Sequence, residues 1–218
     1  MAELESRSID LTLYLVTDSA AAAGRSMETI VADALDGGVT VVQVRDKALP
    51  AGDLADLCRR LLPLTRGAKV PLIVNDRVDV ARAVGADGVH LGGGDLPLAE
   101  ARRVLGQGAV IGGTAASEAM ARAAAAAGAD YLGVGPFRAT PTKTGHATPL
   151  GEEGLARIVR SVELPVVAIG GLEAADAGSV VRAGARGMAV ARAVCAAEEP
   201  GRAAAELRAA LDGAGEQR

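Results

Sequence analysis

Aromatic side chains are nearly absent from this chain of 218 residues. It has no tryptophan, and its tyrosines and phenylalanines together number three. Proteins that hold single-stranded nucleic acid stack the bases on several aromatic rings, and three scattered rings cannot form such a platform. The net charge of −4 also leaves no basic face for a polyanion. We therefore expect no nucleic-acid partner, although a few cations in one cleft suffice for a small phosphate.

The chain has only two cysteines, and it lacks long apolar runs and a leader-like N-terminus. Cys58 and Cys195 lie far apart in apolar or helical contexts, which is typical of free thiols in a reducing compartment. Residues 1–10 carry three acidic side chains and no apolar stretch of the secretory type. No segment approaches the ~18 apolar residues of a membrane span. We expect a cytoplasmic protein with no membrane partner, and the sequence leaves a homo-oligomer open.

The chain is rich in alanine, glycine and aliphatic residues, and half of it is hydrophobic, which is enough for one core. Short apolar runs alternate with longer helical ones. The predicted strands are Leu11–Thr17, Val39–Val44, Val70–Val74, Gly88–Leu91, Ala109–Gly112, Tyr131–Val134, Pro165–Ile169 and Gly187–Val190. The predicted helices are Met27–Asp36, Gly52–Thr65, Val78–Val84, Leu98–Leu105, Glu118–Ala127, Glu152–Val162, Ala174–Ala183 and Gly201–Leu211.

Eight strand–helix units in one chain predict a single-domain (β/α)8 TIM barrel, with a doubly wound open sheet as the alternative. Runs of four to seven apolar residues are typical of strands covered on both faces. We expect residues 1–10 to form an N-terminal extension, residues 11–213 the barrel and residues 214–218 a tail. Ser26, Ser117 and Glu173 stand where helix N-caps are expected.

Polar side chains gather where the predicted strands end, which is where barrel enzymes place their catalytic groups. The second strand carries alternating polar residues that face one side. The candidates in chain order are Gln43, Arg45, Lys47, Asn75, Asp76, His90, Asp95, Thr114, Gly170, Gly171 and Arg192. After the sixth strand, Gly135–Gly145 includes Thr140, Thr142 and Lys143, a combination suited to an anion.

Each candidate also has a purely structural interpretation. The second-strand cations could pair with surface acids, although two like charges on one strand face repel unless an anion lies between them. Asp76 and Asp95 could be turn or cap residues, and His90 a hydrogen-bonded core histidine. Together, however, two carboxylates beside a cationic strand indicate Mg²⁺ bound to a phosphate. The residues alone thus predict a barrel enzyme that holds a Mg²⁺-bound polyphosphate and a second phosphate at its mouth.

Four motifs resemble the thiamine-phosphate synthase (pyrophosphorylase) family, in order and over nearly the whole chain. They are Gln43-Val44-Arg45-Asp46-Lys47, Asn75-Asp76-Arg77, His90-Leu91-Gly92 followed by Asp95-Leu96-Pro97, and Gly135-Pro136 followed by Thr140-Pro141-Thr142-Lys143. The resemblance implies a (β/α)8 transferase that joins 4-amino-5-hydroxymethyl-2-methylpyrimidine diphosphate to 4-methyl-5-(2-hydroxyethyl)thiazole phosphate. The products would be thiamine phosphate and pyrophosphate, with Mg²⁺ as cofactor.

The resemblance also implies a role for each candidate. Gln43 would contact the pyrimidine, and Asp76 and Asp95 would bind Mg²⁺. The diphosphate would lie against Arg45, Lys47, Asn75 and Lys143, with Thr114 nearby. Thr140 and Thr142 would lie close to the thiazole and the leaving group, and Gly171 would donate its N–H to the thiazole phosphate.

Two positions depart from the family pattern. Gly93 stands where the family commonly has Gln, and Arg192 stands where many members have a Ser near the thiazole phosphate. Arginine can bind phosphate in a bidentate manner, or Arg192 could form a surface ion pair instead. Rival interpretations are a thiazole tautomerase relative, a sugar-phosphate isomerase or lyase, and a non-catalytic binder of thiamine intermediates. The Thr140–Lys143 segment with both aspartates argues against the tautomerase, which has no diphosphate to hold.

Overall fold

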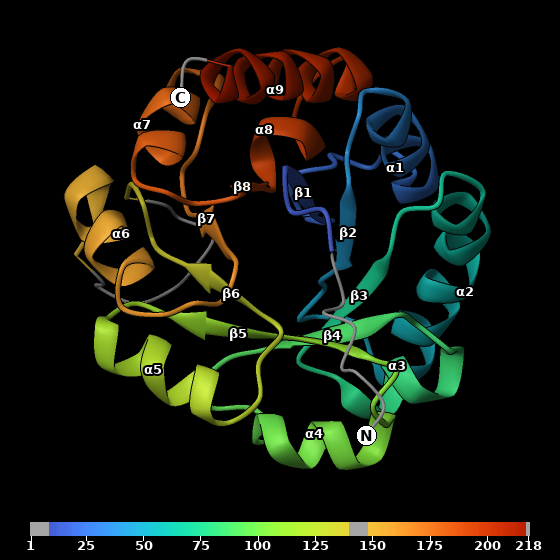
Figure 1. The fold of residues 1–218 in the computed structure, drawn as a ribbon. Coiled ribbons are helices and arrows are strands. Elements are labelled where there is room, and N and C mark those ends of the chain that lie inside the picture. Colours follow the sequence, from blue (N-terminus) through green and yellow to red (C-terminus); the bar gives the residue numbers. More distant parts are fainter. Residues whose placement is uncertain (1–8, 140–147, 217–218) are drawn as a thin grey trace.

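The computed structural model describes residues 9–139 and 148–216 of the chain, and within these ranges eight parallel strands close into a barrel (Figure 1). Each strand pairs with the next along the chain, and β8 pairs with β1 to close the ring. The strands are β1 Leu13–Val16, β2 Val41–Val44, β3 Leu72–Asn75, β4 Gly88–Leu91, β5 Val110–Ala115, β6 Tyr131–Val134, β7 Val166–Ile169 and β8 Gly187–Val190. The predicted TIM barrel is therefore confirmed.

Helices surround this ring of strands on the outside (Figure 1). They are α1 Met27–Asp36, α2 Ala51–Gly67, α3 Val78–Val84, α4 Leu98–Leu105, α5 Glu118–Ala126, α6 Gly151–Val159, α7 Ala177–Arg182 and α9 Pro200–Gly215, with a 3-10 turn η1 at Ala174–Asp176. The short helix α8 Arg192–Cys195 lies nearer the barrel axis than α9, at the mouth of the barrel. Ser26 and Ser117 accept hydrogen bonds from the backbone N–H groups of Thr29 and Met120, as N-caps do. Glu173 forms a capping box with Asp176.

Several predicted element bounds shift by a few residues, and three differences concern the site or the order of the elements. Strand β5 continues to Ala115 rather than ending at Gly112, so Thr114 lies within the strand. The single helix predicted for Ala174–Ala183 is a 3-10 turn followed by α7. The four-residue helix α8 was not predicted, because one turn is too short to show a hydrophobic period.

The main core lies between the strands and the helices and is almost entirely aliphatic. Cys58 and Cys195 are both free and buried there, and burial raises the pKa of each thiol to about 11. Both thiols therefore remain protonated at neutral pH. In the part of the chain that the structure describes, no helix is long and apolar enough to cross a membrane.

A second, smaller cluster fills the inside of the barrel. It includes Tyr14, Val41, Ile73, Tyr131 and Val167, all nearly inaccessible to solvent. A (β/α)8 interior has room for only a few large side chains in each layer, so neighbouring strands must supply small ones.

Glycine on β5 provides that space. In the strand register, Gly112 lies between His90 of β4 and Tyr131 of β6. A Cβ atom at position 112 would lie 2.3 Å from Tyr131 Cζ and 2.5 Å from His90 Nδ1. The absence of a side chain at Gly112 therefore allows His90 and Tyr131 to meet inside the barrel.

We expect Gly112→Ala to destabilise the fold, because the added methyl group overlaps two packed rings. Overpacking of this kind costs about 1–3 kcal/mol, which a urea unfolding curve resolves. The matched control is Gly108→Ala, where nothing lies within 4 Å of the added Cβ. Equal unfolding midpoints for the two variants would contradict this account of the barrel interior.

Candidate active site

A cavity of about 790 Å³ opens at the carboxyl ends of the strands. The candidate site residues that the structure describes all line it: Gln43, Arg45, Lys47, Asn75, Asp76, His90, Asp95, Thr114, Gly170, Gly171 and Arg192. The remaining candidates, Thr140, Thr142 and Lys143, lie outside the described residues. Residues from all eight strand ends or the loops that follow them thus converge on one volume.

The end of β2 and the loop that follows it supply three of these side chains. Gln43 points into the barrel and is 5% exposed, whereas Arg45 and Lys47 follow the last strand residue and are more accessible. The Arg45 backbone is held by Thr17, whose Oγ1 accepts from the Arg45 N–H at 2.9 Å. This bond between the β1 and β2 ends fixes where the cationic segment leaves the strand.

Asp76 and Asp95 form a carboxylate pair beside Lys47. The Lys47 ammonium lies 3.3 Å from Asp76 Oδ2. Asp95 Oδ2 accepts from the Gly92 N–H at 2.6 Å, and this bond closes the turn after β4. Of the two structural alternatives for Asp95, the turn residue is confirmed and the helix cap is wrong, because the N-cap of α4 is Pro97.

Two observations point to a function for this pair beyond turn formation. Burial and the neighbouring Asp76 carboxylate raise the pKa of Asp95 above its usual range. Asp76 also has a φ of 60°, a left-handed conformation that is uncommon outside glycine. Strained backbone and facing like charges cost stability and often mark sites that bind a ligand.

The pair fits Mg²⁺, which takes one or two carboxylates and completes its octahedron with phosphate oxygens and water. The fit rests on hard oxygen donors and on mutual repulsion that a cation would relieve. It does not fit a transition metal held by protein alone, since no group of three His, Cys, Asp or Glu side chains suited to a metal occurs among the described residues.

A continuous chain of hydrogen bonds crosses the barrel below the cavity. Gln43 Nε2 lies 2.8 Å from Tyr14 OH, which lies 2.7 Å from Tyr131 OH. The Tyr131 hydroxyl lies 3.1 Å from His90 Nδ1, and His90 Nε2 lies 3.0 Å from Thr114 Oγ1. His90 is therefore both a hydrogen-bonded interior residue and part of the cavity wall.

Sequence reasoning missed Tyr14 and Tyr131. The three rings described as scattered are not all so, because these two tyrosines lie with ring centroids 5.9 Å apart, and Tyr131 lies 5.6 Å from the His90 ring. A usable signal was present: in a chain nearly free of aromatics, both tyrosines occupy apolar strands that are expected to be buried. A buried phenol needs a polar partner, and the partners are the predicted site residues.

The loops after β6 and β7 form another wall of the cavity. Phe137 N–H donates to the Ile169 carbonyl at 2.8 Å, and Arg138 N–H donates to the Gly170 carbonyl at 2.9 Å. A Cβ at Gly171 would lie 2.9 Å from the Ala139 carbonyl oxygen, so this position favours glycine both for space and for its φ of 65°.

Arg192 begins α8 at the rim of the same cavity. Its guanidinium forms no ion pair within the described residues. The alternative that it forms a surface ion pair is therefore not supported in this part of the chain, and Arg192 lines the same cavity as Gly170 and Gly171.

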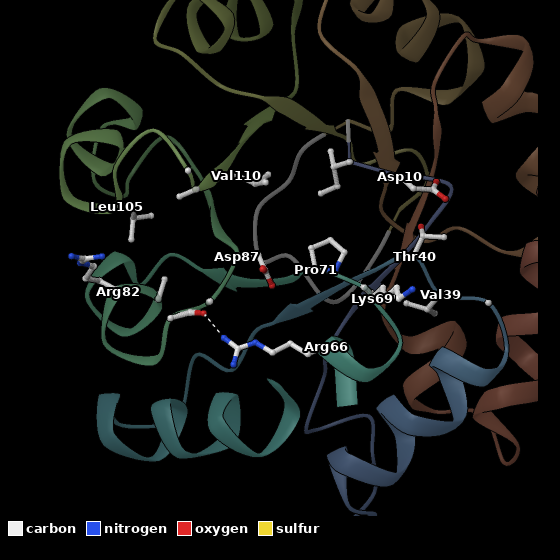
Figure 2. A pocket seen from close by; sticks show the side chains of 18 of the residues that line it. Asp10, Val39, Thr40, Arg66, Lys69, Pro71, Arg82, Asp87, Leu105 and Val110 are labelled. Carbon is white, nitrogen blue, oxygen red and sulfur yellow. Dashed lines mark hydrogen bonds between the residues drawn. The ribbon is translucent and has the colours of Figure 1, made fainter. Parts of the chain in front are cut away.

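A second cavity, of about 930 Å³, lies at the opposite end of the barrel (Figure 2). Its carboxylates are held by backbone: Asp87 Oδ2 accepts from Leu72 N–H at 2.8 Å, and Asp10 Oδ1 accepts from Thr12 N–H at 2.9 Å. The Arg66 side chain reaches the Gly85 carbonyl, as the dashed line in Figure 2 shows. These contacts fix strand starts and loops, which is the stabilising role expected of this face.

We expect Asp95→Asn to stabilise the metal-free protein at neutral pH. A carboxyl group whose pKa is raised in the folded state binds its proton more tightly there, so its ionised form costs stability above that pKa. The advantage of the variant should shrink as the pH falls and Asp95 becomes protonated. Thermal unfolding in EDTA at several pH values measures this, and a lower midpoint for Asp95→Asn at pH 7 would contradict it.

Comparisons with known proteins agree on one family. The family model described as thiamine monophosphate synthase matches residues 13–194. The thiamine-phosphate synthase of Roseiflexus sp. (strain RS-1) is 48% identical over 94% of this chain and 87% of its own length. That of Chloroflexus aurantiacus is 49% identical over 92% of this chain and 93% of its own length.

A solved structure has a similar fold over nearly the whole of this chain. The thiamine phosphate pyrophosphorylase from Pyrococcus furiosus superposes with a TM-score of 0.87 at 39% identity, covering 94% of this chain and 98% of that one. Sequence, fold and the residues that line the mouth of the barrel lead to the same conclusion: the chain belongs to the thiamine monophosphate synthase family.

Proposed function

We propose that the protein joins the aminopyrimidine diphosphate to the thiazole phosphate in a Mg²⁺-dependent substitution, forming thiamine phosphate and pyrophosphate. The observation that carries this proposal is the carboxylate pair Asp76–Asp95 beside Lys47 in a cavity that Arg45 also lines. A diphosphate needs both kinds of group, cations for its oxygens and carboxylates for its metal. The site takes small phosphorylated substrates, and we expect the protein to act in the cytoplasm.

The diphosphate would lie across the ends of β2 and β3. Arg45 and Lys47 would contact its oxygens from one side, and the Asn75 amide from the other. Lys143, which lies outside the described residues, would supply a further cation. In the free protein Lys47 is paired with Asp76, so this ammonium is already held close to the place where the diphosphate would bind.

Asp76 and Asp95 would hold Mg²⁺, and that ion would supply positive charge to the diphosphate as it departs. The C–O bond between the pyrimidine methylene and the diphosphate breaks first, and the electron pair leaves with the diphosphate. The methylene cation is stabilised by the pyrimidine amino group, and the thiazole nitrogen then donates its lone pair to that carbon. This sequence needs no strong general base, and preorganised positive charge lowers its barrier.

The thiazole phosphate would bind between the β7 and β8 ends. Gly170 and Gly171 would offer backbone N–H groups there, and Arg192 would replace the serine that many family members have at this position. Thr140 and Thr142 would lie close to the thiazole and the leaving group. With glycine at position 93, one polar contact that the family commonly makes is absent.

The reaction itself is tested by mixing the purified protein with both substrates and Mg²⁺ and detecting thiamine phosphate by mass. We expect product with Mg²⁺ and none in EDTA, with activity restored when excess Mg²⁺ is added back. Absence of product with Mg²⁺ present would contradict the proposal. Thiazole phosphate that still protected the protein from heat would then favour a tautomerase or a non-catalytic binder.

We expect Lys47→Ala to lower kcat/KM for the aminopyrimidine diphosphate about a hundredfold, because one preorganised charge on the leaving group is worth on the order of 3 kcal/mol. The same loss is expected for Lys143→Ala. The matched control is Lys69→Ala, an exposed lysine at the opposite end of the barrel. Equal values of kcat/KM for Lys47→Ala and Lys69→Ala would contradict the proposed contact between Lys47 and the diphosphate.

A further inference from the structure

The hydrogen-bond chain inside the barrel has a direction, and that direction follows from its first member. An amide nitrogen can only donate, so the contact between Gln43 Nε2 and Tyr14 OH uses an oxygen lone pair of the phenol. Among the described residues, Tyr131 OH at 2.7 Å is the other polar atom within hydrogen-bond distance of Tyr14 OH, so the buried Tyr14 proton is satisfied when it points to Tyr131. The donors in the Tyr131–His90 and His90–Thr114 hydrogen bonds follow by the same reasoning.

The tyrosines carry one proton each because they cannot ionise near neutral pH. Burial raises the pKa of both Tyr14 and Tyr131 well above the usual phenol value. Tyr131 accepts from Tyr14, and its own proton points to His90 Nδ1, 3.1 Å away. A neutral His90 that accepts at Nδ1 must carry its proton on Nε2, which then donates to Thr114 Oγ1 at 3.0 Å.

We infer that Tyr14 and Tyr131 are positioning residues that give the substrate cavity its polarity, with a hydrogen-bond acceptor at Gln43 and a donor at Thr114. Within the described residues, no group donates to Gln43 Oε1 and the Thr114 hydroxyl has no second partner. Both residues line the cavity. The amide oxygen and the hydroxyl proton are therefore both available to a ligand.

This polarity matches the proposed substrate, on which the inference rests. The exocyclic amino group of the aminopyrimidine is a donor and suits the Gln43 carbonyl oxygen. The diphosphate is an acceptor and suits the Thr114 hydroxyl. If every hydrogen bond ran in the opposite direction, Gln43 would present N–H groups to the cavity and Thr114 would present a lone pair. Both groups would then mismatch the same ligand.

The tautomer of His90 reports the direction of the chain without any need for activity. The sequence contains only two histidines, His90 and His146, so ¹⁵N-histidine NMR of the full-length protein gives two sets of ring signals. A His146→Gln variant assigns them. We expect a neutral His90 with its proton on Nε2 and an unprotonated Nδ1. A proton on Nδ1 at neutral pH, in either the neutral or the charged ring, would overturn the inference.

Two variants test whether the tyrosines position the polar groups of the cavity or only stabilise the fold. Tyr131→Phe should abolish the tautomer preference of His90. Tyr14→Phe, which leaves the Gln43 amide free to rotate, should raise KM for the aminopyrimidine diphosphate about tenfold with a smaller effect on kcat. The control Leu11→Ala removes apolar atoms from the same interior cluster at a residue that does not line the substrate cavity. It should lower the unfolding midpoint but change neither the tautomer nor KM.

These outcomes are distinguishable from failure of the proposed function. If the wild-type protein makes no thiamine phosphate, the synthase proposal falls, and the NMR measurement still determines the direction of the chain. If it is active but the tyrosine variants change stability alone, the inference falls and the synthase proposal stands.

Discussion

The limited space inside an eight-stranded barrel is the constraint on which the site depends. Two tyrosines and a histidine share this interior, and they fit because Gly112 has no side chain where the rings meet. Packed this closely, the rings bring their polar atoms within hydrogen-bond distance. No buried side-chain nitrogen or oxygen of the described residues lacks a partner. The polar atoms at the floor of the cavity are thus held by a network of hydrogen bonds.

The mouth of the barrel, in contrast to its interior, contains a strained backbone conformation and carboxylates that repel each other. Asp76 has a left-handed backbone, and Asp95 has a raised pKa beside a second carboxylate. Arg192 has no acidic partner in the described part of the chain. The left-handed backbone and the facing carboxylates cost stability in the free protein, and the proposed Mg²⁺ would relieve the repulsion between the carboxylates. At the other end, Asp10 and Asp87 bond to backbone and stabilise the fold.

Much of this arrangement could be predicted from the sequence, because strands buried on both faces leave uninterrupted apolar runs, and polar residues then stand out at their ends. Gln43, Asp76 and Asp95 were predicted in this way, and all three line the cavity. The tyrosines were missed because Tyr131 reads as one more member of an apolar run, and its partners come from strands far away in the chain. The helix α8 was missed because it is a single turn. Contacts between distant strands are set by barrel closure, which local patterns do not contain.

The central claim is that the carboxyl ends of the strands hold a metal-bound diphosphate between Asp76 and Asp95 on one side and the β2 cations on the other. Crystals grown with pyrophosphate and Mn²⁺ in place of Mg²⁺ test it directly, because manganese is located by its anomalous scattering. The account predicts one strong anomalous peak within coordination distance of the Asp76 and Asp95 carboxylates, with pyrophosphate oxygens on the metal and on Lys47. A fully occupied metal and pyrophosphate elsewhere, with both aspartates unbound, would contradict it.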